Sequence, residues 1–188
     1  MMDDRSRDSI TNSSPLEEID PADQAEIRNI EARKDSLTLD PALLKPDTDL
    51  QANDNTDIRS LIKDMTLPQK VKAAMFGNAT CRALLIKDSQ RVVQEAVLKN
   101  PQLQEREVHD FLKGSNTPEL VIRRIADSKQ WMKSYQAKYL LVSNPKTPID
   151  LGLKWVRYLR RNELKRLAQS KGVSQVIATA ARKRSAQI

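Results

Sequence analysis

The chain has 188 residues and a mass of 21.4 kDa, room for one domain of ordinary size or for a domain and a tail. Charged residues make up 30%, the mean hydropathy is -0.61, and no apolar run approaches the roughly 20 residues of a membrane span, so we expect a soluble, cytoplasmic protein. The single cysteine, Cys81, excludes an internal disulfide and a cysteine cluster, and the single histidine, His109, excludes a mechanism that needs two.

The charge is divided along the sequence. Residues 1–57 carry 15 acidic and 6 basic side chains, a net of −9, and no aromatic residue. Residues 58–188 carry 26 basic and 10 acidic side chains, a net of +16. Because a segment that is poor in apolar residues and strongly charged does not bury enough surface to offset its ordering entropy, residues 1–57 are predicted to form a disordered acidic tail.

Two pieces of this tail have a pattern of their own. Residues 22–33 follow Pro21 and are predicted to form a helix that is marginal alone, since its apolar stripe is only Ala22, Ile27 and Ile30. Residues 36–46 form a short apolar patch in polar sequence, which indicates a possible docking motif. A tail of this charge, tethered to a basic domain, can also contact that domain.

From Asp57 onward, apolar residues recur at three- and four-residue spacings in runs of about 8 to 12, and no stretch alternates long enough for a strand. The sequence therefore predicts an all-α domain of short helices over residues 58–188. We expect Thr117 and Thr147 to cap helices that begin at the following prolines, and we expect Asn100-Pro101 and Asn144-Pro145 to end helices. An additional short helix is predicted over residues 162–169.

The helix ends also repeat. The segment 96–101, which ends in Asn-Pro, matches 140–145 at an offset of 44 residues. Self-similarity of this kind is typical of an α-solenoid, in which no unit closes its own core.

The segment 88–101, DSQRVVQEAVLKNP, resembles the leucine-rich repeat variant and HEAT-like families, whose units run from Asp through an Arg-Val helix to Asn-Pro and a second helix near Thr-Pro. The second copy matches this junction at Ser143-Asn144-Pro145-Lys146-Thr147-Pro148, whereas the first has Leu103-Gln104 where Thr-Pro would stand. The resemblance covers residues 70–182. It implies a short solenoid of stacked HEAT-like repeats and a binding role, and the lone Cys81 excludes the iron–sulfur module that some members carry.

Catalytic chemistry has little support. Phosphate-loop, dinucleotide, zinc-protease and serine-hydrolase motifs are absent, and four glycines leave little material for a phosphate-binding loop. Glu105 and Glu107 are spaced two apart and point away from each other on a helix. Trp131 and Trp155 lie at helical spacing with other apolar residues, which favours a core position. We expect no enzyme, no cofactor and no metal.

The excess of positive charge remains as the functional signal. It suits an anionic partner, and the candidate anion- or partner-binding residues are Arg123, Arg124, Lys154, Arg157, Arg161, Lys165, Arg166, Arg182, Lys183 and Arg184. Lys154, Arg157 and Arg161 are predicted to form one stripe of a single helix. The sequence predicts a non-catalytic adaptor or scaffold that binds a protein partner on its helical-repeat surface. The alternative is a nucleic-acid-binding protein whose basic face contacts phosphates.

Overall fold

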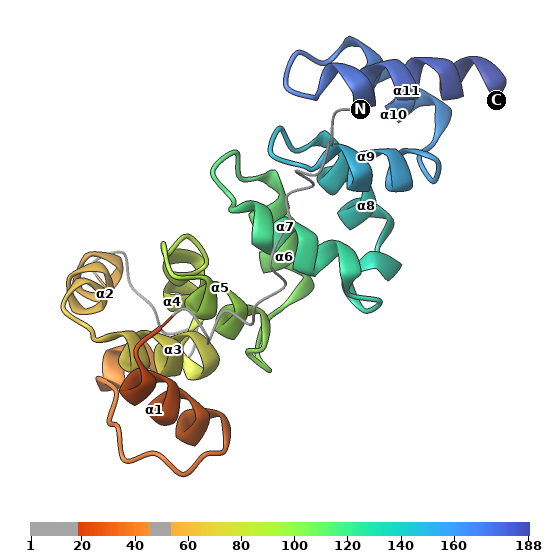
Figure 1. Cartoon of the computed structure of the whole chain (residues 1–188). Coiled ribbons are helices and arrows are strands. Elements are labelled where there is room, and N and C mark those ends of the chain that lie inside the picture. Colours follow the sequence, from red (N-terminus) through yellow and green to blue (C-terminus); the bar gives the residue numbers. More distant parts are fainter. Residues whose placement is uncertain (1–18, 46–53) are drawn as a thin grey trace, which may run out of the picture.

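The computed structural model describes residues 19–45 and 54–188, and every regular element in these residues is a helix (Figure 1). The predicted all-α class is therefore confirmed. In chain order the elements are α1 (Pro21–Glu31), the 3-10 helix η2 (Pro41–Leu43), α2 (Asp54–Lys63), α3 (Leu67–Phe76), α4 (Ala79–Leu85), α5 (Arg91–Leu98), α6 (Glu105–Lys113), α7 (Glu119–Asp127), the 3-10 helix η4 (Trp131–Lys133), α8 (Tyr135–Ser143), α9 (Ile149–Val156), α10 (Arg161–Gln169) and α11 (Gln175–Gln187).

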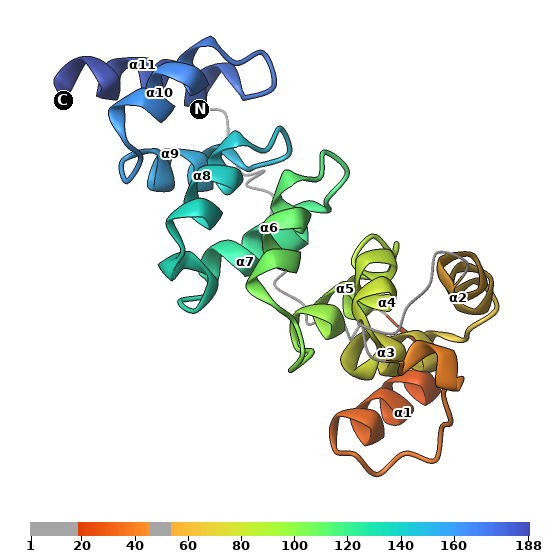
Figure 2. The ribbon, with the colours of Figure 1, turned by 180° about the vertical axis from the view of Figure 1, so that it is seen from behind.

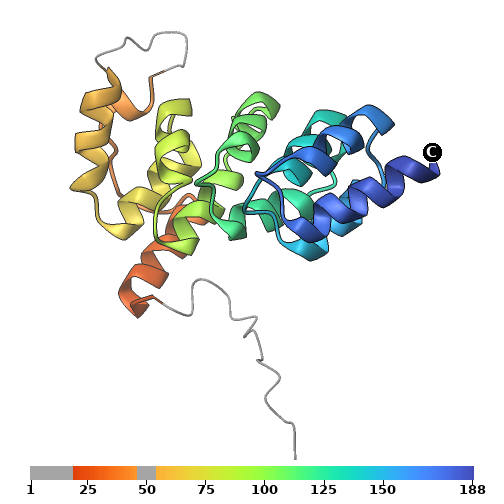
Figure 3. The same cartoon turned by 90° about the horizontal axis from the view of Figure 1, so that it is seen from above.

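The helices form two rows. In the odd row α1 packs on α3, α3 on α5, α5 on α7, and α9 on α11; in the even row α2 packs on α4, α4 on α6, and α6 on α8. Ion pairing between Arg123 and Asp150 joins α7 to α9, and a hydrogen bond from Tyr135 to Glu163 joins α8 to α10. The rows run from α1 and α2 at one end of an elongated molecule to α10 and α11 at the other (Figures 1 and 2), with successive helices side by side in Figure 3.

The spacing of the helices along one row varies. Helices of the odd row begin 24 residues apart between Leu67 and Arg91 but 30 residues apart between Glu119 and Ile149. The offset of 44 residues seen in the sequence is therefore not the structural period, because Asn100 follows α5 in the odd row and Asn144 follows α8 in the even row. The predicted extra helix over residues 162–169 is present as α10.

The two Asn-Pro asparagines tie each helix end to the preceding helix of its row. Asn100 Nδ2 donates to the carbonyl oxygens of Ala74 (2.9 Å) and Gly77 (3.2 Å) at the end of α3. Asn144 Nδ2 donates to those of Leu112 (2.6 Å) and Gly114 (3.0 Å) at the end of α6. Both asparagines are buried, so they satisfy carbonyl groups that a helix end leaves without an intrahelical partner.

The sequence predicted that Thr117 and Thr147 cap the helices that follow them, and this prediction is wrong. Pro118 and Pro148 occupy the N-cap positions of α7 and α9, and the threonine hydroxyls donate backward. Thr117 Oγ1 donates to the Phe111 carbonyl, and Thr147 Oγ1 donates to the Leu141 carbonyl. The reason is burial: both threonines are buried, and each hydroxyl lies beside a carbonyl in the last turn of the preceding helix.

Replacing Asn144 by alanine is expected to lower the free energy of unfolding by about 1–3 kcal/mol, because it removes the side-chain donor to the buried Leu112 carbonyl and one of two donors to the Gly114 carbonyl. Urea denaturation of the full chain measures the change. The matched control is Asn162→Ala on the exposed side of α10, which is expected to shift the midpoint little. Equal midpoints for the two variants would show that the Asn144 bonds add nothing to stability.

The described part of the predicted tail packs on the helical stack. The predicted helix is present as α1, which begins after an Asp20 N-cap and packs on α3, and Ile27, Ile30 and Leu43 are fully buried. This differs from the expected boundary at residue 58. The reason is that α3 and α4 supply the rest of the core, so a few well-placed apolar residues are enough to order this segment.

Residues 35–43 form a strap along α3 and α4, which has no regular structure over residues 35–40 and ends in η2. Side chains alternate between half-buried, at Asp35, Leu37 and Leu39, and exposed, as at Ser36 and Thr38. The apolar patch predicted as a docking motif therefore docks onto its own chain. Residues 1–18 and 46–53 of the predicted tail lie outside the described residues.

Two ion pairs link this acidic segment to the stack. Asp35 lies 2.5 Å from Lys72 Nζ, which also donates to the Leu37 carbonyl, and Glu31 lies 2.7 Å from Lys99 Nζ. The hydrogen bond from Lys72 holds the pKa of Asp35 below its usual value. This pair therefore stabilises the fold above the unfolded-state pKa of an aspartate, and the contribution is lost as the pH falls through the lower folded-state pKa.

Candidate anion-binding surface

The ten candidate cations lie on four helices and a turn. Arg123 and Arg124 belong to α7 and Lys154 to α9, whereas Arg157 lies in the turn after α9. The other six lie on α10 (Arg161, Lys165 and Arg166) and on α11 (Arg182, Lys183 and Arg184). The predicted single stripe is wrong, because α9 ends at Val156 and Arg161 begins the next helix.

The two α7 arginines are already engaged. Arg123 lies 2.9 Å from Glu119 and 3.0 Å from Asp150, and Arg124 lies 2.5 Å from Glu95 on α5. Desolvation alone would lower the pKa of Arg123, but the hydrogen bonds to Asp150 and Glu119 outweigh it and raise the pKa. These arginines join successive helices of the odd row, so they serve the stack rather than an outside anion.

The remaining eight candidates differ in this respect, and we call them the C-terminal cations: Lys154, Arg157, Arg161, Lys165, Arg166, Arg182, Lys183 and Arg184. Within residues 19–45 and 54–188, none of them forms an ion pair with a carboxylate. All are exposed except the half-buried Arg184.

The sequence explains this lack of neutralisation. Residues 129–188 contain 14 basic and 2 acidic side chains, a net of +12. Both carboxylates have other partners: Asp150 binds Arg123, and Glu163 accepts from the Tyr135 hydroxyl and from the Arg160 backbone N–H at 3.3 Å. Burial and the bond to Glu163 raise the pKa of Tyr135, which keeps its hydroxyl a donor. The positive charge of this end of the molecule is thus available to an anion.

Aromatic rings lie among these cations. The Trp155 and Tyr158 rings are 5.3 Å apart between centroids and tilted by 46°. Lys154 Nζ lies 5.4 Å from the Trp155 ring, and Lys138 Nζ lies 5.9 Å from Trp155 and 5.8 Å from Tyr158. Trp155 packs against the core, as does Trp131, in agreement with the sequence prediction for both. The candidate residues chosen from the sequence did not include Lys138 or Tyr158. Lys138 lies on α8, and only the tertiary packing brings it to this cluster.

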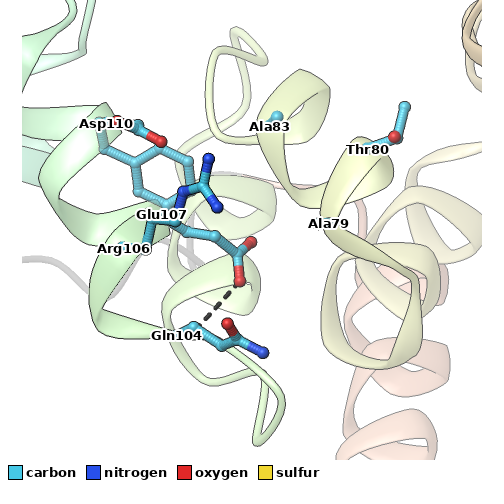
Figure 4. A pocket seen from close by; sticks show the side chains of 8 residues that line it. Ala79, Thr80, Ala83, Gln104, Arg106, Glu107 and Asp110 are labelled. Atoms are coloured by element: carbon cyan, nitrogen blue, oxygen red, sulfur yellow. Dashed lines mark hydrogen bonds between the residues drawn. The ribbon is translucent and has the colours of Figure 1, made fainter. Parts of the chain in front are cut away.

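The even row contains a pocket of about 570 Å³ between α4 and α6, shown in Figure 4. Gln104, Arg106, Glu107 and Asp110 line it from α6 and the residue before it, opposite the small side chains of α4 (Figure 4). Glu107 binds the buried Arg82 guanidinium at 2.8 and 2.9 Å, so its carboxylate serves the fold.

The two neighbouring glutamates of α6 have different partners. Glu105 lies 3.4 Å from His109 on the same helix, whereas Glu107 binds Arg82 on α4. The i, i+2 spacing predicted that these two side chains point away from each other, and their different partners agree with this. Among the described residues no group of three or more His, Cys, Asp or Glu side chains lies close enough to hold a metal ion.

Comparison of the chain with protein-family models, with curated proteins and with solved structures finds no match. None of the helices in the described ranges combines the length and the apolar character needed to cross a membrane.

Proposed function

We propose that the chain is a non-catalytic interaction module, an adaptor or scaffold, built as a short solenoid of HEAT-like repeats that binds a protein partner on its helical surface. The two-row packing supports this, because each helix of 7 to 13 residues is too short to be stable alone and gains its stability from its neighbours. Such a stack offers an extended, rigid surface for a partner. A cytoplasmic setting belongs to the proposal, and the buried, thiol-bearing Cys81 suits a reducing compartment.

The observation that carries the proposal is the charge of the C-terminal end. The C-terminal cations have no carboxylate partner in the described residues, whereas most ion pairs of the stack lie before residue 128. Complementary potentials speed association and orient the partner. The partner is therefore an acidic protein. The surface of this chain that it contacts includes α10 and α11.

The test is a pull-down with the full chain and a charge-reversed variant, Arg157→Glu with Arg161→Glu. The matched control, Lys87→Glu with Arg106→Glu, changes the net charge equally at exposed sites away from the C-terminal cations. We expect the wild type and the control to recover the same acidic protein, and the Arg157/Arg161 variant to lose it. Equal recovery by both variants would place the partner surface elsewhere, and turnover of a small molecule would contradict a non-catalytic role.

Nucleic acid is the second candidate partner, and the specific observation in its favour is that cations and an exposed aromatic ring occur together at this end of the chain. If phosphates are the ligands, log K falls linearly with the logarithm of salt concentration, with a slope of about −0.9 for each duplex phosphate neutralised. Reversing Arg157 and Arg161 is expected to reduce both the affinity and this slope, as measured by fluorescence anisotropy with a labelled duplex at several salt concentrations. Salt-insensitive binding of the duplex would show that its phosphates are not the ligands.

A further inference from the structure

Tyr158 is held in an exposed position on a well-supported turn. The Tyr158 residue is 55% exposed, yet the residues on either side of the turn, Val156 and Leu159, are buried. Two backbone hydrogen bonds fix the turn, from Tyr158 N to the Trp155 carbonyl at 3.0 Å and from Leu159 N to the Val156 carbonyl at 3.3 Å. The tilted contact with Trp155 limits where the ring can go. The ring is therefore preorganised for a partner at little entropic cost.

One cation lies over this ring, and two others come from the adjoining residues of α9 and the turn. Lys138 Nζ lies 5.8 Å from the Tyr158 ring centroid, and Lys154 Nζ lies over the neighbouring Trp155 ring. Arg157 precedes Tyr158 on the turn and is exposed. The nearest acidic residue along the chain, Glu163, is bound to Tyr135 and to the Arg160 backbone, so it does not neutralise these cations.

The combination distinguishes between classes of polyanion. A duplex would use the cations alone, because its bases are already stacked on each other. A single strand offers both a chain of phosphates and unpaired bases, and a base stacked on an aromatic ring contributes about 1–3 kcal/mol.

We propose that Tyr158 is a stacking platform for an unpaired nucleobase, that Lys138, Lys154 and Arg157 contact the phosphates on either side of that base, and that this end of the molecule consequently binds single-stranded nucleic acid more tightly than duplex. This inference rests on the second candidate function, the contact of the C-terminal cations with phosphates. It adds to that function the class of nucleic acid and the residue that selects it.

The first test compares three probes on the full chain at low salt: a labelled 12-nucleotide oligothymidylate, a labelled 12-base-pair duplex, and inorganic polyphosphate as competitor. We expect the single strand to bind more tightly than the duplex. Tyr158→Ala is expected to weaken binding of the single strand roughly 5- to 100-fold while changing the duplex and polyphosphate affinities less than about twofold. Tyr158→Phe keeps the ring and is expected to keep the affinity, and Leu153→Ala, an exposed apolar residue on α9, is the matched control.

A second readout uses the neighbouring tryptophan. In a Trp131→Phe background Trp155 is the only tryptophan, and its ring lies 5.3 Å from that of Tyr158. We expect the oligothymidylate to quench its fluorescence and polyphosphate to leave it nearly unchanged. Equal affinity for single strand and duplex, together with no effect of Tyr158→Ala, would overturn the stacking platform but leave phosphate binding intact. Absence of binding by all three probes at low salt would overturn phosphate binding itself.

Discussion

Replacing Leu43 by alanine is expected to lower the free energy of unfolding of the full chain by about 2–4 kcal/mol, whereas the same change at Leu44 is expected to alter it by less than about 0.5 kcal/mol. The two residues are neighbours, but Leu43 is 0% exposed and Leu44 is 50% exposed. The backbone around Leu43 is also held, since its carbonyl accepts from Asn78 N at 2.9 Å and lies 3.8 Å from Cys81 Sγ. Truncation leaves a cavity between the strap and α4.

Urea denaturation of the two variants makes this comparison with a matched pair. Similar midpoints for Leu43→Ala and Leu44→Ala would show that residues 35–43 do not pack on the helices. Limited proteolysis gives an independent answer: protection of residues 35–43 is expected if the strap is packed, and a resistant fragment that begins near residue 58 if it is not.

Replacing Glu107 by glutamine is expected to lower the free energy of unfolding by about 3–5 kcal/mol, because it removes a carboxylate that pairs with a buried arginine. Arg82 is 0% exposed and donates to both carboxylate oxygens, at 2.8 and 2.9 Å, and to the Gly77 carbonyl at 2.8 Å. Glu107 Oε1 also accepts from Gln104 N at 3.0 Å, which caps α6. The Glu107 side chain therefore links α6 to α4 and also caps the N-terminus of α6.

Thermal or urea unfolding followed by circular dichroism measures this effect. Glu105→Gln is the control on the same helix, because its carboxylate is 58% exposed and an exposed ion pair contributes about 0–1 kcal/mol. A loss at Glu107 as small as that at Glu105 would mean that hydration or another acidic group stabilises the Arg82 charge as well as the Glu107 carboxylate does.

The all-α class could be predicted because helical periodicity is a local property of the sequence, and the same holds for α1 and α10. The docking of the N-terminal segment could not, because composition was averaged over 57 residues. Its few apolar residues, among them Ile27 and Leu43, become buried on partners in α3 and α4 that lie far along the chain. The low apolar content indicated that the isolated segment is only marginally stable. It did not indicate whether the segment becomes ordered when it packs on α3 and α4.

The candidate site was predictable only as a composition. A high density of Lys and Arg marks an excess of charge, but which cations are neutralised depends on pairs separated by many residues, such as Arg124 with Glu95 and Arg123 with Asp150. The Lys138–Tyr158 contact has the same character, since the two residues come from different helices. Side-chain identity predicted where charge is abundant, and only the packing shows where it remains available.

The wide sequence separation of the N-terminal contacts has a consequence for the order of assembly. Helices of the stack pack on neighbours or next neighbours in the chain, whereas Asp35 meets Lys72 across 37 residues and Glu31 meets Lys99 across 68. Contacts that close short loops form faster than contacts that close long ones. During synthesis, α1 leaves the ribosome before α3 and α5 exist, so it cannot dock until both have been made. The first helix of the described residues therefore reaches its final place only after helices that follow it in the chain.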